Sequence, residues 1–160
     1  ASGASSFEIW AQPANLSQSG PARLLSVGAD PSLQNFVLGQ DGDAYQVRLL
    51  HTGKDAKARP RLITTDGASL ALQHIVHTYD GAVERIYIDG VQRSETVALS
   101  GSYDNWDPTD LFNIGNEGGS QRPYYGDVFL VAVYDRALSD AEVAQNFSAG
   151  VGDTTSAPPP

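Results

Sequence analysis

The sequence predicts an all-β protein, a two-sheet antiparallel β-sandwich (jelly roll) with one short C-terminal helix. Three observations predict this class. Strand-like segments recur about every 8 to 12 residues. Asp-Gly pairs, which suit tight hairpin turns, separate several of them. Only 18% of the residues are charged, whereas 16 glycines and 9 prolines favour strands joined by many turns. A length of 160 residues is typical of a single domain.

The first third of the chain reads as a series of short strands. The segment FEIWAQ alternates apolar and polar side chains and ends before Pro13, as a half-buried strand does. A hairpin signal at Asp41-Gly42 precedes another alternating segment. We therefore expect strands over residues 7–12, 24–27, 35–39 and 44–50.

Residues 74–92 give the clearest local signal. Asp80-Gly81 and Asp89-Gly90 are flanked by β-forming residues, and each pair suits a two-residue hairpin loop. His74 and His77 lie three positions apart, so one strand would direct them to opposite faces. The pattern predicts a three-stranded meander over residues 74–79, 83–88 and 91–97.

The last third contains two strands, the helix and a tail. Residues 111–115 form a short strand, and residues 126–134 form the most apolar one, which we expect to be buried on both faces. Ser139 and Glu142 have the spacing of a capping box, which predicts a helix over residues 139–147 that Gly150 can end. Residues 1–150 are thus expected to form one domain, and residues 151–160 a proline-rich linker.

Charge and composition exclude several function classes. The formal net charge of −9 argues against general nucleic-acid binding, and no apolar run is long enough to span a membrane. With no cysteine, disulfides and zinc-thiolate sites are excluded. Five of the ten basic residues fall between Arg48 and Arg61. We expect a solvated loop there; contact with an anionic polymer is the alternative.

Three stretches resemble one known family. EIWAQPANLS near the start, QHIVHTYDG and RIYIDGVQ in the middle, and VYDRALSDAEV near the end are similar to LamG-like jelly-roll domains of the concanavalin A-like lectin/glucanase superfamily. Such domains are common in multidomain secreted bacterial proteins. The resemblance implies an extracellular domain that is tethered to other domains of a longer chain and recognises a glycan. It also implies calcium, although Phe129 and Leu130 replace an acidic pair common in the family.

The catalytic pattern of this fold is missing. Its glucanases use carboxylates at alternate strand positions, E-x-D-x-E, which places them on one face as nucleophile and acid/base. No glutamate of this chain has an acidic residue two positions away in such a triplet. No nucleophile elbow, phosphate loop or zincin motif occurs either.

Two loops hold the side chains that a carbohydrate site needs. Sugars present an apolar face and a rim of hydroxyls, so an aromatic platform beside amide, carboxylate and guanidinium groups suits them. The alternative is that Trp106 and Tyr124 plug the ends of the sandwich. The candidate ligand-binding residues are Tyr103, Asn105, Trp106, Asn116, Glu117, Arg122, Tyr124 and Tyr125.

The same region offers three aspartates to a metal. Asp104, Asp107 and Asp110 could hold Ca²⁺, a hard cation that takes several oxygen ligands. Their spacing fits no standard calcium loop, and capping of Asx turns is the alternative.

These observations predict a non-catalytic carbohydrate-binding module that recognises a polysaccharide through loops of a β-sandwich. The first alternative is a structural or adhesive spacer of a larger secreted or cell-surface protein. The second is a glycan-active enzyme with unconventional residues.

Overall fold

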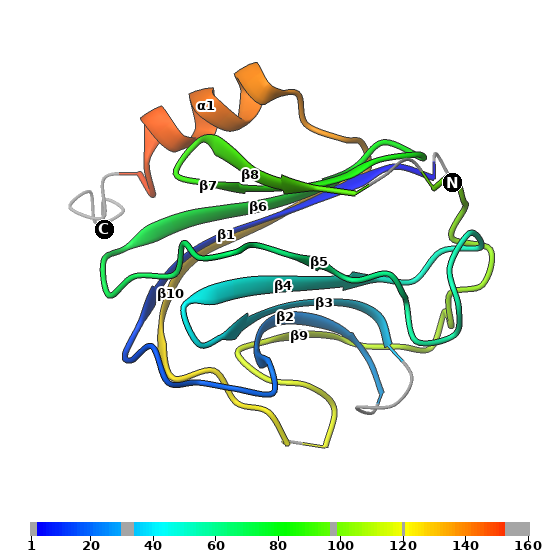
Figure 1. The fold of residues 1–160 in the computed structure, drawn as a ribbon, viewed down its shortest axis with the longest axis horizontal. Coiled ribbons are helices and arrows are strands. Elements are labelled where there is room, and N and C mark those ends of the chain that lie inside the picture. The colour runs from blue at the N-terminus through cyan, green and yellow to red at the C-terminus, as the bar shows by residue number, and fades with distance from the viewer. Residues whose placement is uncertain (1–2, 30–33, 97–98, 120, 153–160) are drawn as a thin grey trace, which may run out of the picture.

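The computed structural model describes residues 3–29, 34–96, 99–119 and 121–152. They form two antiparallel sheets of five strands that pack face to face, so the predicted sandwich is confirmed (Figure 1). Sheet A has the order β10-β1-β6-β7-β8 and sheet B the order β5-β4-β3-β2-β9. The strands are β1 (Ser5–Pro13), β2 (Ala22–Gly28), β3 (Gln34–Asp41), β4 (Ala44–Leu49), β5 (Leu62–Ile63), β6 (Gln73–Tyr79), β7 (Glu84–Ile88), β8 (Val91–Glu95), β9 (Phe112–Ile114) and β10 (Gly126–Tyr134).

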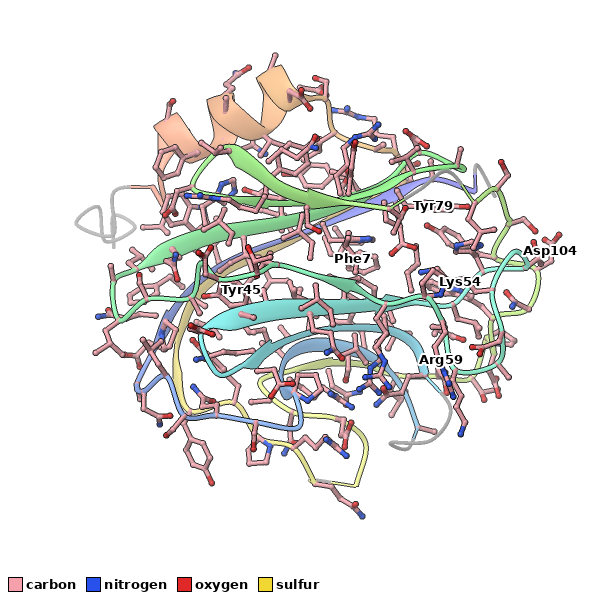
Figure 2. All side chains as sticks on the ribbon, in the orientation of Figure 1. Phe7, Tyr45, Lys54, Arg59, Tyr79 and Asp104 are labelled. Atoms are coloured by element: carbon pink, nitrogen blue, oxygen red, sulfur yellow. The ribbon has the colours of Figure 1, made fainter. Side chains whose placement is uncertain are left out.

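The core fills the space between the sheets. Alternation on β1 sends Phe7 and Ile9 inward, where Phe7 stacks on Phe36 of β3 with ring centroids 3.8 Å apart. Figure 2 labels Phe7 and Tyr45 in this layer. Each predicted strand is present within one to two residues of its expected bounds. The two-residue β5 was not predicted, because so short a strand has no readable alternation.

The two Asp-Gly turns of the meander differ. Ile88 pairs with Val91, and Asp89 and Gly90 both have positive φ, 53° and 77°, which confirms the two-residue loop. The first turn is instead four residues long, because Tyr79 pairs with Glu84. There the Asp80 carboxylate accepts the backbone N–H groups of residues 82 and 83, which closes a wider loop. The third predicted strand ends at Glu95, and residue 97 lies outside the described part.

The expectation that β10 is buried on both faces is wrong. It is an edge strand of sheet A that pairs only with β1 among the described strands. Phe129 and Val133 are 49% and 53% exposed. An apolar run reports composition, whereas burial depends on which segments cover the strand. The predicted tail is described only as far as residue 152.

The helix α1 (Asp140–Ala149) covers the outer face of sheet A (Figure 1). Its predicted capping box is present, with Ser139 as N-cap and Glu142 returning the bond. Phe147 stacks on Trp10 and lies close to His74. His74 also bonds Glu8 at 2.9 Å, so the histidine is part of the structural contact beneath the helix.

The basic loop after β4 is not fully solvated. The side chain of Lys54 is 1% exposed and forms an ion pair with Glu84, which reaches between the sheets from β7. His77 contributes a contact of 3.4 Å from its Nε2 to the same carboxylate. The expected solvated loop is therefore wrong at this position, because a buried carboxylate needs a cation beside it. Arg59, by contrast, is exposed and lies 3.5 Å from the exposed carboxylate of Asp55 in the same loop.

Candidate functional site

The two predicted binding loops lie at opposite ends of β9. Residues 103–107 precede this strand at one end of the sandwich, and residues 116–119 and 121–125 follow it at the other (Figure 1). The eight candidate residues therefore do not form one site. The structure brings Asn116, Glu117, Arg122, Tyr124 and Tyr125 together and separates them from Tyr103, Asn105 and Trp106.

Aromatic side chains of the first loop are used for packing. Trp106 donates its indole N–H to the Leu50 carbonyl at 2.6 Å, and its ring contacts Tyr103. The Tyr103 hydroxyl lies 2.7 Å from Ser5 Oγ, and burial raises the pKa of this phenol. Asn105 is exposed. The two rings thus close one end of the sandwich, which for Trp106 is the role given above as the alternative to ligand binding.

Two aspartates of this loop accept hydrogen bonds from neighbouring residues. The Asp107 carboxylate accepts the backbone N–H and the hydroxyl of Thr109, at 2.8 and 2.7 Å. The Asp104 carboxylate accepts the Ser102 hydroxyl at 2.7 Å. Among the described residues, no group of three or more His, Cys, Asp or Glu side chains is arranged to hold a metal ion. The Asx-turn role accounts for the contacts of Asp107, and calcium binding by Asp104, Asp107 and Asp110 stays a prediction.

Glu117 anchors the second loop on sheet B. Its carboxylate accepts Arg23 Nε at 2.8 Å and Gln34 Nε2 at 2.7 Å. Arg122 lies 3.6 Å from the other carboxylate oxygen, and the Asn116 side chain caps the loop by accepting the backbone N–H groups of Glu117 and Arg122. Glu117 is buried, so it holds the loop in place and does not face a ligand directly.

Adjacent tyrosines in this loop have opposite environments. Tyr124 is 8% exposed, and burial raises the pKa of its phenol. Tyr125 is 60% exposed. Of the two rings only Tyr125 can act as a platform for a ligand.

Tyr125 lines a groove between the loop after β1 and the loop before β10. The groove holds about 450 Å³ and has a polar lining. Sugars bind such surfaces through stacking on an exposed ring and bonds to amide and guanidinium groups. We call it the Tyr125 groove; it is lined by Asn15, Ser17, Gln18, Ser19, Ala22, Gln121, Arg122, Pro123 and Tyr125.

One side chain fixes the two walls of the Tyr125 groove. The buried Gln18 amide accepts the Tyr125 backbone N–H at 2.7 Å and donates to the Tyr125 carbonyl at 2.8 Å. It also donates to Gln40 Oε1 at 2.9 Å, which ties both loops to β3. Sequence reasoning missed Asn15 and Gln18. The polar run NLSQ directly after a strand was the available signal, but it has no distinguishing spacing.

Comparison with family models agrees with the fold. The model described as the concanavalin A-like lectin/glucanases superfamily matches residues 1–144. Among curated proteins, none matches this sequence.

Three solved structures illustrate the similarity. The carbohydrate-binding module CBM40 of a Ruminococcus gnavus sialidase, bound to α2,3 sialyllactose, has a TM-score of 0.71 and 17% identity over 89% of this chain and 81% of its own. Domain 4 of the Geobacillus stearothermophilus arabinanase AbnA, in complex with arabinotriose, has a TM-score of 0.59 and 19% identity. That match covers 91% of this chain and 66% of the AbnA domain. A Bacteroides ovatus protein, whose carbohydrate-binding role is itself only proposed, has a TM-score of 0.68 and 17% identity. The match covers 91% of this chain and 41% of that one.

Proposed function

This chain belongs to the concanavalin A-like lectin/glucanases superfamily, and on that premise we propose that it is a non-catalytic module that binds a polysaccharide outside the cell. The exposed Tyr125 ring in the polar groove carries the proposal. A sugar ring can stack on the phenol while Arg122 and the amides of Asn15 and Gln121 bond its hydroxyls. Structural neighbours that hold sialyllactose and arabinotriose support this class of ligand.

The environments of the buried glutamates support a non-catalytic role. Glu8 bonds His74 under the helix, Glu84 pairs with Lys54 in the core, and Glu117 pairs with Arg23. Each carboxylate is engaged by a side chain inside the protein, whereas hydrolysis of a glycoside needs two carboxyl groups that flank the substrate.

No described helix is long and apolar enough to cross a membrane. We propose that the domain is tethered to other domains, which would bring the polysaccharide close to them.

Affinity electrophoresis in gels that contain one polysaccharide each tests the proposed function. We expect at least one polysaccharide to retard the protein and Tyr125→Ala to abolish the retardation, because the platform is removed. Phe129→Ala is the matched control, since Phe129 is a comparably exposed ring on β10 outside the groove. The proposal is wrong if no polysaccharide retards the protein, or if Tyr125→Ala and Phe129→Ala behave alike.

A second candidate function, adhesion between copies of this domain, rests on the edge strands β9 and β10. Phe112, Ile114, Phe129 and Val133 are exposed there, and unpaired sheet edges bind other chains readily. Sedimentation of the protein against Phe129→Lys tests this function: contact through this edge predicts self-association that the lysine weakens. A monomer at all concentrations would argue against a self-contact.

A further inference from the structure

The outer face of sheet B carries a row of arginines. On β4, Tyr45, Val47 and Leu49 point into the core, so Gln46 and Arg48 point outward. Val47 pairs with Leu62, and the next position of the same register places Arg48 opposite Arg61.

The row continues across β3 to the Tyr125 groove. Arg48 pairs with Val37 of β3, and Arg23 of β2 pairs with Gly39 of β3. Positions 37 and 39 lie on the same face of β3, so the two arginines share that face of the sheet. The Arg23 backbone N–H donates to the Arg122 carbonyl at 3.0 Å, which places residue 122 beside β2. From β5 to β2 the row spans about 14 Å, three spacings of ~4.8 Å between strands. We call Arg23, Arg48, Arg61 and Arg122 the arginine row.

Acidic side chains neutralise only one end of this row, at Arg23 and Arg122. Glu117 pairs with Arg23 and lies 3.6 Å from Arg122. Within the described residues, Arg48 and Arg61 have no carboxylate in ion-pair range, and the Arg48 guanidinium bonds only Gln46 Oε1, at 3.0 Å. Burial and the charges of the other three arginines lower the pKa of Arg48 to about 10.

Repulsion among these arginines destabilises the folded protein unless an anion binds between them. Like charges directly opposite each other on paired strands repel, by up to about 1 kcal/mol. The chain as a whole has 19 acidic and 10 basic residues, so an arrangement of several arginines with one carboxylate stands against the net charge of −9. A planar guanidinium with free N–H groups binds carboxylate and sulfate groups in a bidentate manner.

We infer that the polysaccharide bound by this domain is anionic, with carboxylate or sulfate groups held by Arg48 and Arg61 while a neighbouring sugar ring occupies the Tyr125 groove. This inference rests on the proposed function and adds the ligand class. Because the rest of the protein repels polyanions, attachment must come from this local row and not from general charge attraction.

The inference is tested by measuring binding to polygalacturonate, dextran sulfate and neutral dextran. Affinity electrophoresis and calorimetry provide the measurement. Polygalacturonate carries carboxylates and dextran sulfate carries sulfates, so the two arms identify the anionic group. We expect one of them to bind, with an affinity that falls steeply as NaCl is raised. Arg48→Gln and Arg61→Gln should each weaken it by about tenfold, the loss of one charged hydrogen bond.

Arg93→Gln is the matched control, because Arg93 is an exposed arginine on β8 of the other sheet. It should change the affinity by less than about twofold, since surface charges away from the site contribute little. Arg61 is exposed, so its variant is expected to fold even if Arg48→Gln does not; circular dichroism checks both.

The outcomes separate the two proposals. If dextran or another neutral polysaccharide binds at the Tyr125 groove and neither polyanion does, the inference fails and the proposed function stands. If polyanion binding is the same in Arg61→Gln and Arg93→Gln, the inference also fails. If no polysaccharide binds at all, both proposals fall.

Discussion

The Gln18 side-chain amide makes two hydrogen bonds with the backbone of Tyr125: it accepts the N–H at 2.7 Å and donates to the carbonyl at 2.8 Å. A glutamine from the loop after β1 thus sets the position of the exposed ring in the loop before β10. Both walls of the groove are held in this way without a ligand, and preorganisation of this kind reduces the entropy lost on binding.

Gln18→Ala is expected to weaken both the groove and the fold. It leaves the Tyr125 N–H without its protein partner, which costs about 1 to 3 kcal/mol of the free energy of unfolding in urea. The Tyr125 carbonyl keeps the bond that it accepts from the Ala14 N–H at 3.0 Å. Polysaccharide affinity should fall as well, although the Tyr125 ring itself is intact. Gln92→Ala, at an exposed position on β8, is the control and should change neither quantity. Unchanged affinity in Gln18→Ala would show that the groove does not depend on this tie.

Acid should destabilise the protein through Glu84. Burial alone would raise the pKa of Glu84, but the side chains of His51 and His77 and the charge of Lys54 beside the carboxylate hold this pKa well below 4.5. A carboxyl whose pKa is lower in the folded state contributes stability above pH 4.5 that is lost as the pH falls through the folded pKa. The free energy of unfolding should therefore drop steadily below pH 4.5, as measured by urea denaturation between pH 7 and 2.5.

Glu84→Gln isolates this contribution. The variant should be less stable than the wild type at pH 7 by about 3 to 5 kcal/mol, because Lys54 then lacks its buried partner. The difference between the two proteins should shrink as the pH falls below 4.5. Glu95→Gln, at an exposed position, is the control. A constant difference at all pH values would contradict the assigned role of Glu84.

Chelation of metal ions is expected to have no effect on this domain. The Asp107 carboxylate is engaged by Thr109, and Asp104 accepts the Ser102 hydroxyl. Melting temperature and polysaccharide retardation should therefore be equal in 5 mM calcium and in EDTA, measured by differential scanning fluorimetry and affinity gels. Stabilisation by calcium that disappears in Asp107→Asn would restore the calcium site suggested by the family resemblance.

Local signals predicted much of the fold, because they depend on neighbouring residues. The Asp89-Gly90 turn needs two positive φ values, and the helix needs a capping box between Ser139 and Glu142; both can be read from a few positions. The exposure of β10 and the burial of the Lys54 side chain could not be predicted in this way. Each depends on a distant segment, the absence of a second described neighbour for β10 and the position of Glu84 for Lys54.

The candidate site was predictable only in part for the same reason. Residue types identified the loop that contains Arg122 and Tyr125, but not that Tyr124 turns inward and Tyr125 outward. Trp106 was a reasonable platform by composition, and its bond to the Leu50 carbonyl becomes visible only in three dimensions. The role of Gln18 and the alignment of the arginine row both depend on contacts between segments that are distant in the sequence.

An NMR titration of ¹⁵N-labelled protein with an oligosaccharide of the retarding polysaccharide tests the central claim most directly. If the Tyr125 groove is the binding site, the largest amide shifts will fall on Gln18, Arg122 and Tyr125, and they will disappear in Tyr125→Ala. Shifts confined to the opposite end, around Asn105, or no shifts at saturating oligosaccharide would contradict the account.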